Sequence, residues 1–173
     1  MDSPTTASEW LEHEDNSARA QRTARLEWLV THYPSAQGFM LHGGWLSKQL
    51  LEEAKYCFVY GQYVALAILS VAFLERTLAA RFYGSGRDDL ERAGGADLLR
   101  QALQTGSISQ DEFLLFERMR RLRNPLVHFR RPLAKDTVEA RAVASDCHPD
   151  TILESDAREI LLGLLAILQR QAV

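Results

Sequence analysis

Apolar side chains recur along this chain at the spacing of amphipathic helices, and no segment shows the alternation of a half-buried strand. Residues 10–31 are rich in Ala, Arg, Glu and Leu, a composition typical of a surface helix. A second helix, running to about Tyr60, is indicated by apolar side chains at Leu46, Leu50, Leu51 and Ala54. Gly61 is expected to interrupt it.

The most apolar stretch of the chain is residues 62–83, where Ala, Leu, Ile, Val and Phe occupy nearly every helical face. Such a helix is stable in water only when neighbours cover it on several sides. We therefore predict a central, buried helix. A short helix is predicted at residues 96–103, and a terminal one at about residues 155–171.

Between these two helices lie an Arg-rich helix and a long connection. Ser109 and Glu112 fit a capping box, in which a hydroxyl and a carboxylate satisfy the first free backbone amides of a helix, so the Arg-rich helix should begin there. Residues 135–150 are small and polar without a sustained period, which predicts a long loop with room for about one turn of structure.

The pattern as a whole predicts an all-α protein, an antiparallel bundle of four to five helices. A chain of 173 residues, 46% of them hydrophobic, can fill a single core, so one domain is expected over residues 1–173. Residues 1–8 are polar and are expected to be flexible.

Composition and charge narrow the function classes. The formal net charge of -3 argues against a protein that coats nucleic acid over its whole surface, so any such contact should be local. The N-terminus lacks the basic start and apolar stretch of a signal peptide, which predicts a cytoplasmic location with free thiols at Cys57 and Cys147. The apolar run at residues 63–74 is shorter than the ~20 residues that cross a bilayer, so no membrane association is expected.

A local cationic patch lies on the predicted Arg-rich helix and just after it, at Arg118, Arg120, Arg121, Arg123, Arg130 and Arg131. Guanidinium groups match the geometry of phosphate oxygens, so this patch is a candidate RNA-binding surface. A bare run of arginines is equally typical of a solvated helix face whose charges pair with acids elsewhere. Composition alone leaves both interpretations open.

Within the patch, Asn124 and His128 are four residues apart, and a continuous helix would place them on one face with Arg123 about 140° from His128. Pro125 changes this expectation, because proline cannot donate to the carbonyl four residues earlier and disfavours helical geometry in the residue before it. We predict a kink or restart, with Asn124 as the N-cap of a new turn. The kink would bring Arg123 and Asn124 toward His128.

The segment Arg123-Asn124-Pro125-Leu126-Val127-His128 resembles the signature of HEPN domains, an Arg and a His separated by four to six residues, commonly with a polar residue such as Asn directly after the Arg. The motif occurs late in an Arg-rich helix, after a central apolar helix and before a terminal one, as it does in that family. This similarity of layout covers about residues 45–172, whereas specific residues are shared only in the motif.

The resemblance implies a HEPN-like bundle, frequently a homodimer, with metal-independent endoribonuclease activity in toxin, antiphage or RNA-processing systems and with no cofactor. Arg123 and His128 would be the catalytic pair, and Asn124 would orient them. An antitoxin or a nucleotidyltransferase is a further candidate partner. The family toxins that a nucleotidyltransferase modifies carry a Tyr two residues after the His, where this chain has Arg130, which puts that mode of silencing in doubt.

These residue types suit RNA cleavage for a chemical reason as well. Attack of a ribose 2′-hydroxyl on the adjacent phosphate needs a base, an acid for the leaving 5′-oxygen, and a cation for the charge that develops on the phosphate. One His cannot readily be base and acid in the same step. We therefore predict that two copies of His128 and Arg123 meet at a two-fold dimer interface.

The remaining candidates have structural alternatives. Glu75 ends the apolar run of the central helix, either as an exposed carboxylate or as a supporting salt-bridge partner of a motif arginine. Aromatic side chains at helical spacing can stack bases but more often fill a core. The aromatic candidates in this chain are Tyr56, Tyr60, Tyr63 and Phe82. No metal site is predicted, because the histidines lack ligand spacing.

Two function classes follow for this chain. The first is an endoribonuclease that cuts single-stranded RNA. The second is a non-catalytic HEPN-like module that binds RNA or a nucleotide, or that only dimerises. A histidine packed at a helix end and bonded to a backbone carbonyl is the structural alternative for His128.

Overall fold

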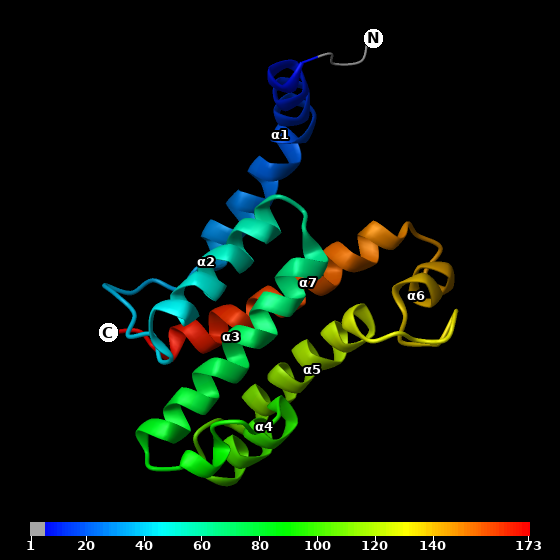
Figure 1. Ribbon diagram of the computed structural model, residues 1–173. Coiled ribbons are helices and arrows are strands. Elements are labelled where there is room, and N and C mark those ends of the chain that lie inside the picture. Colours follow the sequence, from blue (N-terminus) through cyan, green and yellow to red (C-terminus); the bar gives the residue numbers. More distant parts are fainter. Residues whose placement is uncertain (1–5) are drawn as a thin grey trace.

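The computed structural model describes residues 6–173, and this part of the chain is all-α, as predicted, with no strand beyond an isolated bridge between Phe39 and Ala172. Figure 1 shows the helices in order: α1 (Ala7–His32), α2 (Gly44–Val59), α3 (Tyr63–Gly84), α4 (Gly95–Gln104), α5 (Gln110–Val127), α6 (Val138–Ala144) and α7 (Pro149–Gln169), with a 3-10 turn, η1 (Asp88–Leu90), after α3.

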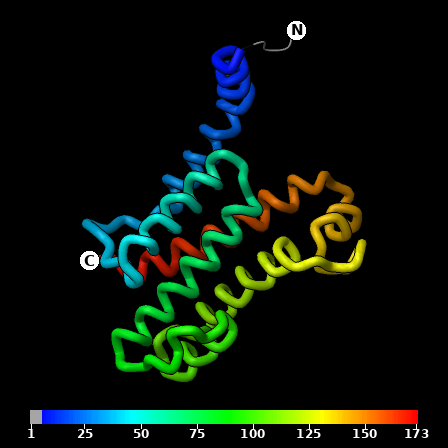
Figure 2. The backbone as a smooth tube through the Cα atoms, in the orientation of Figure 1, coloured from blue at the N-terminus to red at the C-terminus, as the bar shows by residue number. Residues whose placement is uncertain are grey.

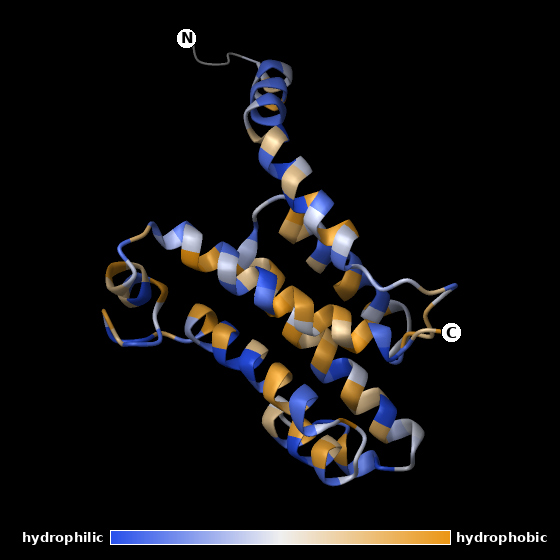
Figure 3. Ribbon diagram, turned by 180° about the vertical axis from the view of Figure 1, so that it is seen from behind, coloured by the Kyte–Doolittle hydropathy of each residue, from blue (hydrophilic) through white to orange (hydrophobic). Residues whose placement is uncertain are grey.

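Helix α3 lies at the centre of the bundle. Helices α2, α5 and α7 pack against it, and α4 closes the lower end of Figure 1, where it contacts both α3 and α5. Helix α1 packs on α2 through its C-terminal part, while its first half extends clear of the bundle (Figure 2). That first half is mostly hydrophilic (Figure 3), and Arg25 and Leu29 are the buried residues of α1.

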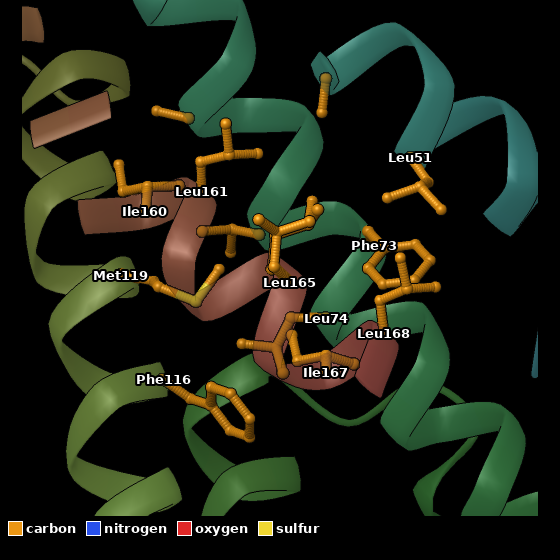
Figure 4. Close-up of a cluster of buried hydrophobic side chains, with 14 of the residues drawn as sticks. Leu51, Phe73, Leu74, Phe116, Met119, Ile160, Leu161, Leu165, Ile167 and Leu168 are labelled. Carbon is orange, nitrogen blue, oxygen red and sulfur yellow. The ribbon is translucent and has the colours of Figure 1, made fainter. Parts of the chain in front are cut away.

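The core forms where α3 and α7 cross, joined by α5 and α2. Figure 4 shows side chains from these helices pointing into one space, among them Phe73, Leu74, Phe116, Met119, Ile160, Leu161, Leu165 and Leu168. All of them are almost fully buried. Packing of this kind accounts for the apolar surface of α3 and of α7, which the sequence left without an assigned neighbour.

Helix α3 is longer than the apolar run from which the absence of a membrane span was predicted. It has 22 residues, and an 18-residue window within it has a mean hydropathy of 1.6, so by length and composition it could cross a membrane. Of this stretch, 44% is buried inside the structure, against α2, α5 and α7. The core helix of a bundle has the same composition.

Three predictions need correction. The described residues form seven α-helices, not the predicted four to five. Residues 6–8 of the segment predicted to be flexible are ordered, because Thr6 and Glu9 form a capping box and α1 begins at Ala7. Residues 1–5 lie outside the described part. The predicted loop at 135–150 contains a helix of 7 residues, α6, and the first residues of α7.

Helix α6 depends on a tertiary contact that its sequence does not reveal. Arg141 makes two hydrogen bonds of 2.6 Å to the carboxylate of Asp156 on α7, and Asp156 is 3% exposed. A bidentate pair of this kind is among the stronger polar contacts in proteins. It holds a helix too short to be stable alone, which is why the periodicity of the segment did not predict one.

Helices α5 and α7 approach closely at Gly163. A Cβ atom built on Gly163 would lie 2.3 Å from Sδ of Met119, whose side chain is fully buried. We expect Gly163→Ala to lower the free energy of unfolding by about 1–2 kcal/mol, because overpacking outweighs the gain in helix propensity. Urea denaturation measures this. The matched control is Gly84→Ala, since a Cβ on Gly84 meets nothing within 4 Å; equal stability of both variants would contradict the packing.

The predicted capping box at the start of α5 is confirmed. Ser109 Oγ accepts from the Glu112 amide at 3.2 Å, and the Glu112 carboxylate accepts from the Ser109 amide at 2.7 Å. Arg170, just after α7, adds contacts of 2.6 and 2.7 Å to the same carboxylate. Burial alone raises the pKa of Glu112, but the Ser109 amide and Arg170 outweigh it and lower the pKa below its usual value.

The lowered pKa of Glu112 predicts how the stability of the protein changes with pH. The contribution of Glu112 is present above the pKa that this group has in the unfolded chain, and it is lost as the pH falls through the lower pKa of the folded state. Glu112→Gln should therefore be less stable than the wild type at pH 7, and the difference should shrink below about pH 4. Urea titrations at several pH values test this, and a difference independent of pH would contradict it.

Candidate functional site

Helix α5 carries the Arg-His motif at its C-terminal end. The buried side chains of α5 are Phe116, Met119 and Leu122, and they fix the rotation of the helix against α3 and α7. The helix ends at Val127, and His128 follows with an extended backbone, its amide donating to the Asn124 carbonyl at 3.0 Å. The core of the bundle therefore sets the direction of every motif side chain.

The predicted break at Pro125 does not occur. Helix α5 runs through Pro125 to Val127, so Asn124 lies inside the helix and is not an N-cap. Pro125 is within the last turn, where its missing amide deprives the Arg121 carbonyl of one helical hydrogen bond. Leu122 is 4% exposed and Leu126 packs against the core, so tertiary contacts on both sides hold the helix through the proline.

Helix α5 ends at Val127 and His128 has an extended backbone, so the helical repeat does not set the angle between the Arg123 and His128 side chains. Among the described residues, no hydrogen bond joins the two side chains. Arg123 does contact Asn124, through a long hydrogen bond of 3.4 Å from Nη1 to Oδ1. A side-chain hydrogen bond thus joins two of the three predicted catalytic residues, Arg123 and Asn124, and none joins either of them to the His128 side chain among the described residues.

Arg123 is half-buried, and its Nε atom is enclosed by protein without a hydrogen-bond partner. Its only polar contact among the described residues is the one to Asn124. An enclosed donor without a partner costs about 1–3 kcal/mol. Such a group is rare in stable cores and is more frequent where a site is organised for a ligand or a partner.

His128 lies on the wall of a cleft of about 670 Å³, formed by the end of α5, the segment that follows it, and the starts of α6 and α7. Val64 of α3 and Leu153 of α7 add apolar side chains to this wall. The His128 side chain is exposed. It is therefore open to solvent and to a ligand, unlike a histidine packed into a core.

The arginines of the patch fall into two groups. Three have a carboxylate partner: Arg118 with Glu159 at 2.9 Å, Arg120 with Glu117 at 2.6 Å, and Arg130 with Asp136 at 3.1 Å. Arg121 is 3.9 Å from Glu117 and its side chain is 76% exposed, and Arg131 is exposed with no ion pair among the described residues. Half of the patch is thus partly neutralised within the chain.

Glu75 is not joined to a motif arginine in the described part of the chain. Its carboxylate lies against Gly95 at the start of α4, where a Cβ atom would be 2.1 Å from Oε1. This places a negative charge at the positive end of the α4 dipole. Glu75 therefore connects α3 to α4. No contact with a motif arginine in the described residues supports the role predicted for it.

A buried polar cluster that the sequence analysis did not single out joins α1 to α3 and α7. Arg25 is 8% exposed, and it donates from Nε to the Val59 carbonyl at 2.9 Å and from Nη1 to the Tyr63 hydroxyl at 3.0 Å. That hydroxyl donates to Glu154 at 2.8 Å. Burial, followed by the hydrogen bond to Glu154, raises the pKa of Tyr63.

The cluster is closed by Arg158, which donates to Glu154 at 2.6 Å and lies over the Trp28 ring at 5.1 Å. Burial by itself raises the pKa of Glu154, but hydrogen bonds from Arg158 and Tyr63 outweigh it and lower the pKa. The one sequence signal was the position of Arg25, four residues before Leu29 on the inner stripe of α1. The hydrogen bonds among these side chains indicate an anchor for α1.

The predicted aromatic candidates are divided by the fold. Phe82 is buried, Tyr63 belongs to the cluster just described, and Tyr56 and Tyr60 are exposed and stack on each other at 4.2 Å. None of these four lines the cleft of His128. The aromatic side chain that does line it is Phe129, which the sequence analysis passed over.

In the part of the chain that the structure describes, no three His, Cys, Asp or Glu side chains gather where they could hold a metal ion. Cys57 and Cys147 are free thiols. No protein-family model, curated protein or solved structure matches the chain. The HEPN resemblance thus depends on the motif and its setting among the helices.

The proline inside α5 has a measurable cost. Pro125→Ala restores the hydrogen bond to the Arg121 carbonyl and removes the clash with it, so we expect the free energy of unfolding to rise by about 1 kcal/mol. Urea denaturation gives the value, and far-ultraviolet circular dichroism checks that helix content is kept. A destabilised Pro125→Ala variant would show that the proline ring supports the cleft wall more than it strains the helix.

Proposed function

We propose that this protein is a metal-independent endoribonuclease with a HEPN-like fold, of the toxin or defence type, which cuts single-stranded RNA in the cytoplasm. The observation that carries the proposal is the position of His128, exposed on a cleft at the end of the same helix that holds Arg123 without an acidic partner. A proton-transfer group and a cation at one helix end are what cleavage at a phosphate requires.

The reaction needs no water and no metal. The 2′-oxygen of a ribose attacks the adjacent phosphorus while a base takes its proton, and the bond from phosphorus to the 5′-oxygen breaks as an acid protonates that oxygen. The products are a 2′,3′-cyclic phosphate and a free 5′-hydroxyl. Histidine exchanges protons near neutral pH and can fill either role, and Arg123 stabilises the negative charge that builds on the phosphate oxygens.

The site is proposed to be completed by a second copy of the chain. Within one subunit His128 is a single proton-transfer group, and no hydrogen bond joins its side chain to Arg123 among the described residues. Exposed apolar side chains lie near the cleft, with Val64, Ile68 and Val127 exposed by 41%, 40% and 38%. Apolar surface of this kind is typical of homodimer interfaces. A two-fold axis there would bring two copies of the motif together.

RNA phosphates would meet the free cations first. Arg121 and Arg131 are exposed, and neither makes a close ion pair in the described structure. Arg118 and Arg130 are held by carboxylates in exposed pairs, which contribute little to stability, so phosphate can compete for them. The pair of Arg120 with Glu117 is partly buried. Asn124 orients Arg123 through its amide oxygen.

A specific observation favours a second candidate, a non-catalytic HEPN-like module that binds RNA or dimerises. Glu117, Glu159 and Asp136 neutralise part of the patch, and the motif pair does not converge in one subunit. Both features are compatible with a surface that binds without cutting. Cleavage and binding must therefore be measured separately.

The first test incubates purified protein with single-stranded RNA in the presence of a chelator. We expect fragments that end in a 2′,3′-cyclic phosphate, and a loss of at least about a hundredfold in rate for His128→Ala and for Arg123→Ala, as for removal of an acid-base group. Matched controls are His13→Ala and Arg100→Ala, both exposed residues on other helices, α1 and α4. RNA binding by the wild type without cleavage would contradict the endoribonuclease proposal and support the non-catalytic module.

The same assay tests the shared site. Dimers are mixed at a ninefold excess of His128→Ala over wild type and allowed to exchange subunits. If both copies of His128 act in one site, the activity per wild-type chain should fall about tenfold. The reason is that only about one wild-type chain in ten then pairs with another wild-type chain. Unchanged activity per wild-type chain would show that each subunit cuts by itself.

A further inference from the structure

Phe129 is the most exposed large apolar side chain among the described residues, at 89%. It directly follows His128 and lines the same cleft of about 670 Å³. Other exposed aromatic residues exist, among them Trp10, Trp45 and Tyr83, but none of these three lines the cleft of His128. An unpartnered aromatic ring beside a proton-transfer group points to a ligand that covers it.

The surroundings of Phe129 identify the kind of ligand. Arg130 and Arg131 follow it and line the cleft, and Glu139 is the acidic residue of the described lining. Arg131 has no ion pair in the described structure, and Arg130 shares only its Nε with Asp136. A flat aromatic face next to free guanidinium groups fits a nucleobase joined to its phosphate.

A second copy of this chain fits the ring less well. The cores of protein interfaces are depleted of charged residues. Covering Phe129 with another subunit would also take Arg130 and Arg131 out of water, at a cost in solvation that needs new partners. A nucleic-acid strand supplies those partners, because each base comes with a phosphate.

We propose that Phe129 is a stacking platform for one nucleobase of a single-stranded RNA, next to the phosphate that lies at His128. This subsite depends on the proposed function for its RNA, but not on cleavage. It positions the strand: the base stacks on Phe129, Arg131 binds a neighbouring phosphate, and the backbone between them passes the imidazole. Stacking tolerates any base, so the subsite selects for unpaired strands and not for a sequence.

The test uses a 2′-O-methyl oligonucleotide, which cannot be cut, carrying a single 2-aminopurine whose fluorescence is quenched by stacking. Wild type should bind and quench it. Phe129→Ala and Phe129→Leu should lose the quenching and bind roughly 5- to 150-fold more weakly, the range for one stacked base. Phe129→Trp should retain both. Tyr83→Ala is the matched control, an exposed aromatic residue at the far end of α3.

Each remaining outcome decides a specific point. Equal binding by Phe129→Ala and wild type would overturn the subsite and leave the ribonuclease standing. A lower mass for Phe129→Ala in sedimentation would assign the ring to a subunit interface and overturn the subsite too. Binding and quenching without cleavage of ordinary RNA would keep the subsite and overturn the catalytic proposal, and absence of any RNA binding by the wild type would overturn both.

Discussion

The structure depends on one requirement, which is to cover the apolar faces of α3. No single neighbour can do this, so α2, α5 and α7 each take one side, and the largest buried side chains gather where these helices meet. The close approach of α5 and α7 at Gly163 belongs to the same packing. Because α5 is held by its own buried stripe, its rotation is set by the core. The core therefore also sets the orientation of the motif residues on the last turn of α5.

Tertiary packing overrides the proline in the motif. Local preference alone would break the helix at Asn124 and fold the motif back on itself. Instead Leu122 and Leu126 keep the helix in contact with the core past Pro125, and the helix ends at His128. The chemical consequence is that Arg123 faces partly into the protein while His128 faces a cleft. Such a division suits a site assembled from two subunits better than one assembled from a single chain.

The cationic patch contains both arginines that pair with carboxylates and arginines that do not. Carboxylates from α5, α7 and the segment after the motif hold three of the patch arginines, so the phosphate-binding capacity of the surface is smaller than its composition suggests. The groups that stay free, Arg121, Arg131 and the exposed Phe129, are concentrated toward the end of α5 and the segment after it. Elsewhere the cluster around Arg25 is joined by hydrogen bonds and connects α1 to the bundle, which is a structural role.

The sequence by itself determined the all-α class, the central helix, the capping box of α5 and the cationic patch, because periodicity, caps and composition are local properties. It could not place α6, which depends on Arg141 meeting Asp156, nor the course of α5 through Pro125, nor the position of Glu75 beside Gly95. It also could not tell paired from unpaired arginines, since the acids that pair Arg118 and Arg130 come from other segments. These features were decided by the tertiary structure, because each is a contact between residues whose separation along the chain says nothing about their distance in space.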